Sequence, residues 1–158
     1  MPKMLRLAPI AIVIAVSAAG CGGSSGTTKT KLVAEADPIC KQVAVARAAA
    51  NTAIAKAGSS TSKSLKIVAR VAPPIGAEEL KAVAKLRTIK APASLESDWR
   101  QLLSGMEQLG NDASALGAHA KAGEYKALTS ITASGRKLRE RLTKIATRDG
   151  FSYCGRTS

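Results

Sequence analysis

The chain has 158 residues, 24 of them basic and 11 acidic, with one histidine and three cysteines. This length fits one small domain and is too short for a two-lobed solute receptor or an α/β barrel enzyme. Apolar residues make up 46%, which excludes a disordered polymer. Much of this apolar fraction is alanine, so we expect a thin core formed by close approach of backbones.

The first twenty residues have the pattern of a secretory signal peptide. Lys3 and Arg6 give a positive start, and residues 7–19 form an uncharged apolar run that ends in small residues. This run of 13 residues is shorter than the roughly 18–20 residues that a helix needs to span a bilayer. We therefore predict a signal peptide over residues 1–20, and a permanent transmembrane anchor is the weaker interpretation.

The segment Ala18-Ala19-Gly20-Cys21 resembles the bacterial lipobox, the cleavage site of lipoprotein signal peptidase. The resemblance implies that Cys21 receives a diacylglyceryl group and anchors the mature protein to the outer face of the cytoplasmic membrane. One departure is Ala18, where leucine is usual. Ordinary cleavage after Ala19, which would release a soluble protein, remains the alternative.

The residues that follow Cys21 have the composition of a flexible tether. Residues 22–28 are all glycine, serine or threonine. We therefore assign residues 21–36 to the lipidated cysteine and its tether, and residues 37–158 to a helical bundle domain. Such a tether would hold the domain close to the membrane.

The other two cysteines, Cys40 and Cys154, are expected to form a disulfide, because leftover cysteines in exported proteins are most often paired. The alternative is two unpaired thiols. The bridge would close a loop of about 115 residues, which the chain-entropy model stabilises by roughly 4.5–5 kcal/mol. The sequence contains neither a CxxC redox site nor a CxxCH haem attachment site.

The first helix is predicted to begin at Asp37-Pro38, with the aspartate as N-cap and the proline at the first helical position. A short helical lead-in from Lys31, kinked at Pro38, is also possible. Apolar residues then recur at spacings of three and four, which is one face of a helix. Gly58 and the Ser/Thr residues after it should end this helix.

The second predicted helix begins near Ser62 and reaches Ile89. Its apolar residues again follow a helical spacing. Pro73-Pro74 lies in the middle, and because proline lacks the amide hydrogen and clashes with the preceding turn, we expect one kinked helix or two short ones in line. Ala91-Pro92 marks the next turn.

The third predicted helix has the clearest pattern. Ser94 is its expected N-cap, and Glu96 and Asp98 lie in the first turn, where acidic side chains complement the helix dipole. Its apolar residues form a heptad seam that Gly123 ends. A fourth helix follows, with apolar residues spaced by three and four over residues 128–145.

No segment of useful length alternates with period two, so we predict an all-α fold without a sheet. Four amphipathic helices with short connections are typical of an antiparallel up-down-up-down bundle. The expected disulfide supports an even number of helices. Three helices would separate Cys40 from Cys154 by roughly 30–40 Å, whereas disulfide-bonded Cα atoms lie within about 7 Å of each other.

Short motifs mark both ends of the predicted domain: Ala36-Asp37-Pro38-Ile39-Cys40 opens it, and Gly150-Phe151-Ser152-Tyr153-Cys154-Gly155 closes it. With the lipobox-like start, they resemble a group of small exported actinobacterial lipoproteins that begin with Ala-Asp-x-Ile-Cys and end with an aromatic-containing Cys-Gly. The resemblance covers the chain ends and the helical pattern between them. It implies a disulfide-closed helical domain and no particular activity.

Catalytic and metal chemistry has little support in the sequence. His119, the only histidine, lies on the rim or outside of the third helix with Asp112 on the same face, and the Glu-x-x-His pair of di-metal bundles is absent. Glu78-Glu79, or Glu96 with Asp98, could act as the paired carboxylates of a glycosidase, but acidic residues in a first turn are usually dipole partners. We therefore predict no enzyme, no metal and no cofactor.

The basic residues favour contact with an anionic surface. Without Lys3 and Arg6 the net charge falls only from +13 to +11, so the charge belongs to the folded domain. Nucleic acid is a poor candidate for an exported protein whose basic stripes lack interleaved aromatic residues. Anionic lipid and cell-wall polymer are better candidates. The predicted contact residues are Lys63, Lys66, Arg70, Lys81, Lys85, Arg136, Arg139 and Lys144.

These patterns favour a membrane-tethered cell-envelope lipoprotein, a non-catalytic interaction or structural bundle whose basic surface faces anionic lipid or wall polymer. The alternative is an extracytoplasmic carrier that binds a small apolar ligand or lipid between the helices. An enzyme would need a cleft where acidic residues or His119 converge. The sequence does not identify a protein partner.

Overall fold

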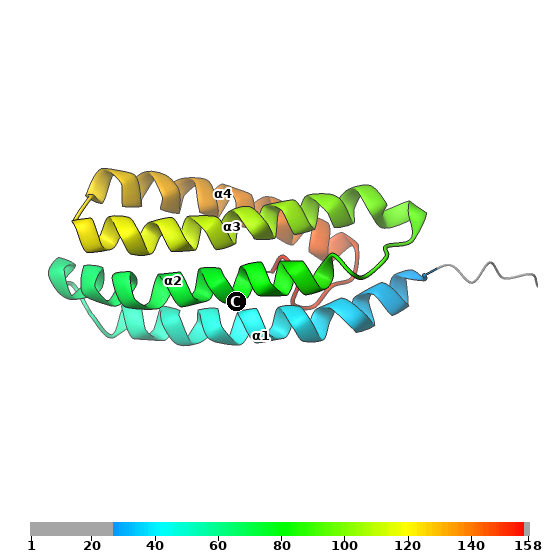
Figure 1. Ribbon diagram of the computed structural model, residues 1–158, viewed down its shortest axis with the longest axis horizontal. Helices are drawn as coiled ribbons and strands as arrows, with labels where there is room; N and C mark the ends of the chain where they lie inside the picture. The colour runs from blue at the N-terminus through cyan, green and yellow to red at the C-terminus, as the bar shows by residue number, and fades with distance from the viewer. Residues whose placement is uncertain (1–26, 157–158) are drawn as a thin grey trace, which may run out of the picture.

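A computed structural model describes residues 27–156. This part of the chain forms four long helices and no strand, and the helices run alternately up and down (Figure 1). The elements are α1 (Lys29–Ala55), α2 (Thr61–Leu86), the short 3-10 helix η1 (Ala93–Leu95), α3 (Glu96–Ala122) and α4 (Tyr125–Arg148). The predicted all-α four-helix bundle is therefore confirmed.

The predicted signal peptide, the lipobox-like segment and Cys21 lie outside the described residues. Within residues 27–156, no helix combines the length and the apolar character that crossing a bilayer requires.

The four helices do not pack equally. α2 and α3 form the closely packed central pair, α1 packs against α2, and α4 packs against α3. Within the described part of the chain, α1 and α4 make little direct contact with each other. The space between α1 and α4 is therefore not closed by direct helix packing, and its filling depends on the size of the side chains that face it.

Glycines allow the close approach of α2 and α3. A Cβ atom at Gly76 would overlap the backbone carbonyl of Gly110, and one at Gly117 would overlap the ring of Pro73. These positions confirm the expected close approach of helix backbones, here between α2 and α3.

The start of α1 differs from the predicted one. Thr28 is the N-cap, and its side chain accepts a hydrogen bond from the N–H of Lys31. Asp37-Pro38 lies inside the helix, so the prediction that Asp37 caps it is wrong, and residues 29–36 are helical instead of belonging to the tether. Leu32 and Ala36 are fully buried in the core, and their burial outweighs the cost of a proline within the helix. The alternative of a helical lead-in before Pro38 is confirmed, although the helix begins at Lys29 and not at Lys31.

The sequence patterns were incomplete at the middle of α2 and at the start of α3. α2 is one continuous helix through Pro73-Pro74 and is not split there. Ser94 does not cap α3, because it lies within η1, and the residue before α3, Leu95, makes no side-chain cap. Glu96 lies in the first turn as predicted, and Gly123 ends α3 with a φ of 74°.

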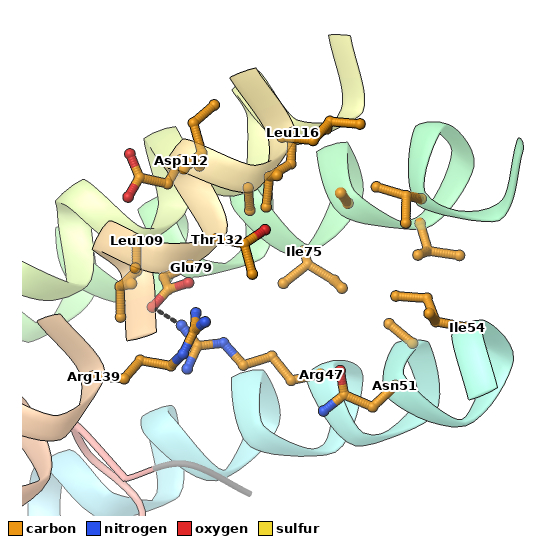
Figure 2. A pocket seen from close by; sticks show the side chains of 18 residues that line it. Arg47, Asn51, Ile54, Ile75, Glu79, Leu109, Asp112, Leu116, Thr132 and Arg139 are labelled. Atoms are coloured by element: carbon orange, nitrogen blue, oxygen red, sulfur yellow. Dashed lines mark hydrogen bonds and ion pairs between the residues drawn. The ribbon is translucent and has the colours of Figure 1, made fainter. Parts of the chain in front are cut away.

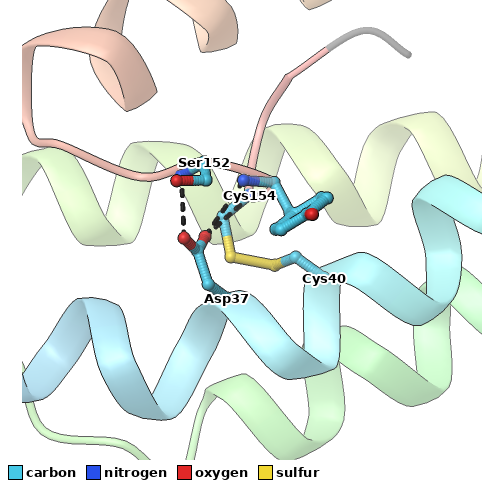
Figure 3. Close-up of a disulfide and its surroundings, with 5 residues drawn as sticks. Asp37, Cys40, Ser152 and Cys154 are labelled. Atoms are coloured by element: carbon cyan, nitrogen blue, oxygen red, sulfur yellow. Dashed lines mark hydrogen bonds between the residues drawn. A yellow bond between two sulfur atoms is a disulfide. The ribbon is translucent and has the colours of Figure 1, made fainter.

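Cys40 and Cys154 form the predicted disulfide, with their Cα atoms 5.0 Å apart (Figure 3). The carboxylate of Asp37, one turn before Cys40, accepts hydrogen bonds from the backbone N–H groups of residues 152, 153 and 154. Trp99 stacks on Phe151 in the same region, with ring centroids 5.7 Å apart. The C-terminal segment thus fills this end of the bundle and leaves the other half uncovered.

Candidate ligand-binding cavity

A cavity of about 470 Å³ lies between the helices (Figure 2). Its lining residues belong to the half of the bundle away from the Cys40–Cys154 disulfide. All four helices contribute to its walls. Its volume falls within the roughly 300–1,000 Å³ that is usual for small-molecule sites. The branched apolar side chains that line it are Ile54 of α1, Val68, Val71 and Ile75 of α2, Leu116 of α3, and Leu128 and Ile131 of α4.

Short side chains on the inward faces of the helices leave this space open. Ala50, Ala72, Ala113 and Gly135 line the cavity, one from each helix. Because α1 and α4 do not pack against each other, nothing compensates for the missing volume, and the branched side chains around it stay only half-buried. The many small residues therefore produce this cavity as well as a close-packed α2/α3 pair.

Four charged side chains form the polar end of the cavity, again one from each helix: Arg47, Glu79, Asp112 and Arg139 (Figure 2). We call these four residues the charged cluster. Glu79 is only 1% exposed and forms an ion pair with Arg47. The cavity is thus amphipathic along its length, with a charged end and an apolar end.

Burial shifts the pKa values of the charged cluster. It raises the pKa of Glu79, and the positive charge of Arg47 offsets part of that rise. Burial also raises the pKa of Asp112, against the charge of Arg139. The pKa of Arg139 is lowered, first by burial and then by the nearby charge of Arg47. Two guanidinium groups therefore lie close enough to repel each other in a partly dehydrated site.

Three groups of the charged cluster keep unused hydrogen-bonding capacity. Oε2 of Glu79 and Oδ2 of Asp112 are buried and accept no hydrogen bond within the described part of the chain. Arg139 is half-buried, and among residues 27–156 it has neither a hydrogen bond nor an ion pair. Buried polar groups normally have partners, so these three mark the polar end as a place where a ligand can bind.

The predicted anionic contact residues separate into two groups. Arg139 lies in the cavity, because it faces inward beside Gly135 and Leu138 on α4. The other seven are exposed: Lys63, Lys66, Arg70, Lys81 and Lys85 on α2, and Arg136 and Lys144 on α4.

The carboxylates considered as catalytic pairs do not converge. Glu78 is exposed and pairs with Lys81 at 2.8 Å, while Glu79 turns inward. Hydrogen bonding to Lys81 lowers the pKa of Glu78. Asp98 forms an ion pair with Arg148. Each of these carboxylates therefore has its own cationic partner.

His119 lies apart from the charged cluster and contacts Glu124, the N-cap residue of α4. Its Nδ1 atom is 2.5 Å from Oε2 of Glu124. Asp112, predicted on the same face, lines the cavity instead. In the part of the chain that the structure describes, no three His, Cys, Asp or Glu side chains lie where they could share a metal ion.

Sequence reasoning missed Arg47 as a site residue, and it considered Glu79 only as one of a catalytic carboxylate pair with Glu78 or as a helix-dipole partner. Both residues could have been found from the sequence, because each is a charged residue at a position that the helical spacing assigns to the apolar face. Arg47 follows Val43 by four residues and precedes Ala50 by three, and Glu79 precedes Val83 by four. Charged residues at inward positions of two helices of one bundle predict a buried charged pair.

No protein-family model, no curated protein and no solved structure matches this chain. Function therefore has to be inferred from the residues of the cavity and of the surface.

Proposed function

We propose that the protein is a non-catalytic carrier of the bacterial cell envelope, tethered through Cys21, that binds an apolar or amphiphilic small molecule between its helices. The cavity that all four helices line carries this proposal. It favours the carrier over a purely structural bundle, because folded domains rarely retain unfilled spaces much larger than a water molecule.

The placement of apolar and charged side chains along the cavity also supports a carrier. An apolar chain placed in the cavity would cover the half-buried side chains of Ile54, Ile75 and Ile131, and removal of apolar surface from water drives binding. The buried pair of Arg47 with Glu79 limits how far the chain can enter. The carrier would therefore hold its ligand in one orientation.

Binding of the neutral apolar dye N-phenyl-1-naphthylamine tests the carrier function. We use the full-length chain with Cys21→Ser, which cannot be acylated, and expect saturable binding of one dye per chain. Val71→Trp fills the cavity and should abolish this binding. Val45→Trp is the matched control, because Val45 is 62% exposed and lies outside the cavity. Equal binding by both variants, or no binding by the parent chain, contradicts the proposal.

The anchor at Cys21 rests on the lipobox-like sequence alone. Intact-mass analysis of protein extracted from membranes should show a chain that begins at Cys21 and carries a diacylglyceryl group. The same mass should be two hydrogens below that of the reduced chain, because of the Cys40–Cys154 bridge. A secreted chain that begins at Gly20, with no added lipid, would exclude the anchor.

Contact of the basic surface with anionic lipid or wall polymer is a second proposal. Lys63, Lys66 and Arg70 form an exposed stripe on α2, and within residues 27–156 their side chains have no ion pair. Each basic residue close to an anionic membrane adds roughly 1 kcal/mol of attraction. The stripe would hold the bundle against the surface to which Cys21 tethers it.

Vesicle sedimentation tests the basic surface. We expect the unacylated chain to bind vesicles that contain phosphatidylglycerol, and binding to weaken with salt. Replacing Lys63, Lys66 and Arg70 with glutamine should weaken binding roughly a hundredfold. The control replaces Lys56, Lys90 and Lys121, which are exposed and scattered, with the same loss of charge. Equal effects of the two triple variants would refute a defined contact surface.

A further inference from the structure

The two arginines of the charged cluster differ in their partners. Arg47 is paired with Glu79, while Arg139, close enough for the charge of Arg47 to act on it, has no hydrogen bond or ion pair among the described residues. Figure 2 shows both guanidinium groups at the same end of the cavity. Glu79 is paired with Arg47, and Asp112 acts on Arg139 by its charge but forms no ion pair with it among the described residues. The guanidinium of Arg139 therefore keeps its N–H donors free for a ligand.

We propose that Arg139 binds the anionic head group, a carboxylate or a phosphate, of an amphiphile whose hydrocarbon chain lies in the apolar part of the cavity. This inference rests on the proposed carrier function and specifies its ligand class. The planar guanidinium presents five N–H donors in a fork that matches both acids. An anion beside Arg139 also relieves the repulsion between Arg139 and Arg47.

The remaining members of the charged cluster fit this assignment. Burial makes Glu79 and Asp112 easier to protonate than exposed carboxyls, since their pKa values are raised. Arg47 and Arg139 offset the two carboxylates, so the charged cluster carries no net negative charge that would exclude an anion.

The length of the cavity sets the size of the ligand. Arg139 and Leu128 are eleven residues apart on α4, or about 16 Å along the helix axis. Arg47 and Ile54 are seven residues apart on α1, or about 10 Å. An acyl chain of medium length has an extended length between these two values, so decanoate is a suitable probe.

Competition with N-phenyl-1-naphthylamine, at physiological ionic strength on the full-length Cys21→Ser chain, tests the head-group assignment. The competitors are decanoate, decyl phosphate, decanol and decylamine, which share a chain and differ in the head. We expect both anions to bind at least about tenfold more tightly than decanol, because a hydrogen bond to a charged group adds roughly this factor. Decylamine should bind most weakly.

Arg139→Gln should reduce the preference for decanoate over decanol to about one, because the group that distinguishes the two heads is removed. Arg136→Gln is the matched control, since Arg136 is exposed on the same helix and the charge change is identical. If Arg139→Gln does not fold, Arg139→Lys replaces it and should lower the preference without removing it. Binding of decanol without any preference for anions, or a preference for decylamine, would overturn the assignment while leaving the carrier intact. Failure of every competitor and of the dye would reject the carrier itself.

Discussion

The carboxylate of Asp37 accepts a hydrogen bond from the backbone N–H of Cys154, with the two atoms 3.3 Å apart (Figure 3). The same carboxylate accepts from the N–H groups of Ser152 at 2.8 Å and Tyr153 at 3.1 Å. Asp37 thus binds the C-terminal segment that Cys154 links covalently to Cys40.

Asp37→Ala should lower the free energy of unfolding by about 1–3 kcal/mol, because three backbone donors lose a charged acceptor. Thermal unfolding measures this loss, and hydrogen exchange should accelerate at residues 152–154. Glu35→Ala is the control, since Glu35 is an exposed carboxylate on the same helix. Unchanged exchange at residues 152–154 would show that Asp37 does not hold the segment.

Removal of the disulfide should destabilise the domain more than removal of Asp37. Cys40→Ala with Cys154→Ala opens a loop that spans 114 positions of sequence separation, and loss of such a bridge typically costs about 2–5 kcal/mol. Chemical unfolding of the oxidised parent and of the double variant measures the difference. Cys21→Ser should leave the stability unchanged, and a double variant as stable as its parent would be inconsistent with a structural bridge.

The stability of the bundle should depend on pH through Glu79. Burial raises the pKa of this carboxyl above its ordinary value of 4.5, so the folded chain holds the proton more tightly than the unfolded chain. Ionisation of Glu79 therefore lowers the free energy of unfolding as the pH rises above about 4.5 through the raised pKa. Glu79→Gln removes this loss, so the melting temperature of the variant relative to the parent should increase between pH 4 and pH 7.

Glu78→Gln gives the opposite sign and serves as the control. Lys81 lowers the pKa of Glu78, so the folded chain holds this proton less tightly and ionisation stabilises the fold. The relative melting temperature of Glu78→Gln should therefore fall slightly over the same pH range. If the two variants show the same pH dependence, Glu79 does not titrate as a buried carboxyl.

The α2/α3 contact should not tolerate a side chain at Gly117. A Cβ atom there overlaps the ring of Pro73, and overpacking of this kind costs about 1–3 kcal/mol. Gly117→Leu should therefore unfold at a lower temperature than the parent. Ala118→Leu, at the neighbouring exposed position, should change the melting temperature little. A Gly117→Leu variant as stable as Ala118→Leu would mean that the helices can separate without cost.

Local patterns were sufficient to locate the helices, and the predicted export with two remaining cysteines was sufficient to predict the disulfide. The apolar spacing located all four helices, and an even helix number was consistent with a bond between Cys40 and Cys154. Local patterns failed at Asp37, whose three partners lie at the other end of the chain. An Asp-Pro pair looks the same in sequence whether it starts a helix or lies inside one. Here the helix extends before the pair because Leu32 is buried in the core.

The cavity depends on information that no single helix contains. The inward positions of Arg47 and Glu79 are visible in the sequence, and so are the small residues of the apolar faces. α1 packs on α2 and α4 packs on α3, so α1 and α4 remain apart at these positions. This separation cannot be read from any one helix. Arg139 was therefore assigned to the surface with its basic neighbours, although it belongs to the cavity.

An isoleucine-methyl NMR titration of the full-length Cys21→Ser chain with decanol tests the cavity most directly. Ile54, Ile75 and Ile131 line the cavity, whereas Ile39 and Ile89 pack against the core near the disulfide. We predict that the three cavity methyl signals shift together and saturate at one decanol per chain, while the signals of Ile39 and Ile89 stay in place. Shifts spread equally over all five residues, or no saturable shift at all, would contradict a ligand-binding cavity between the helices.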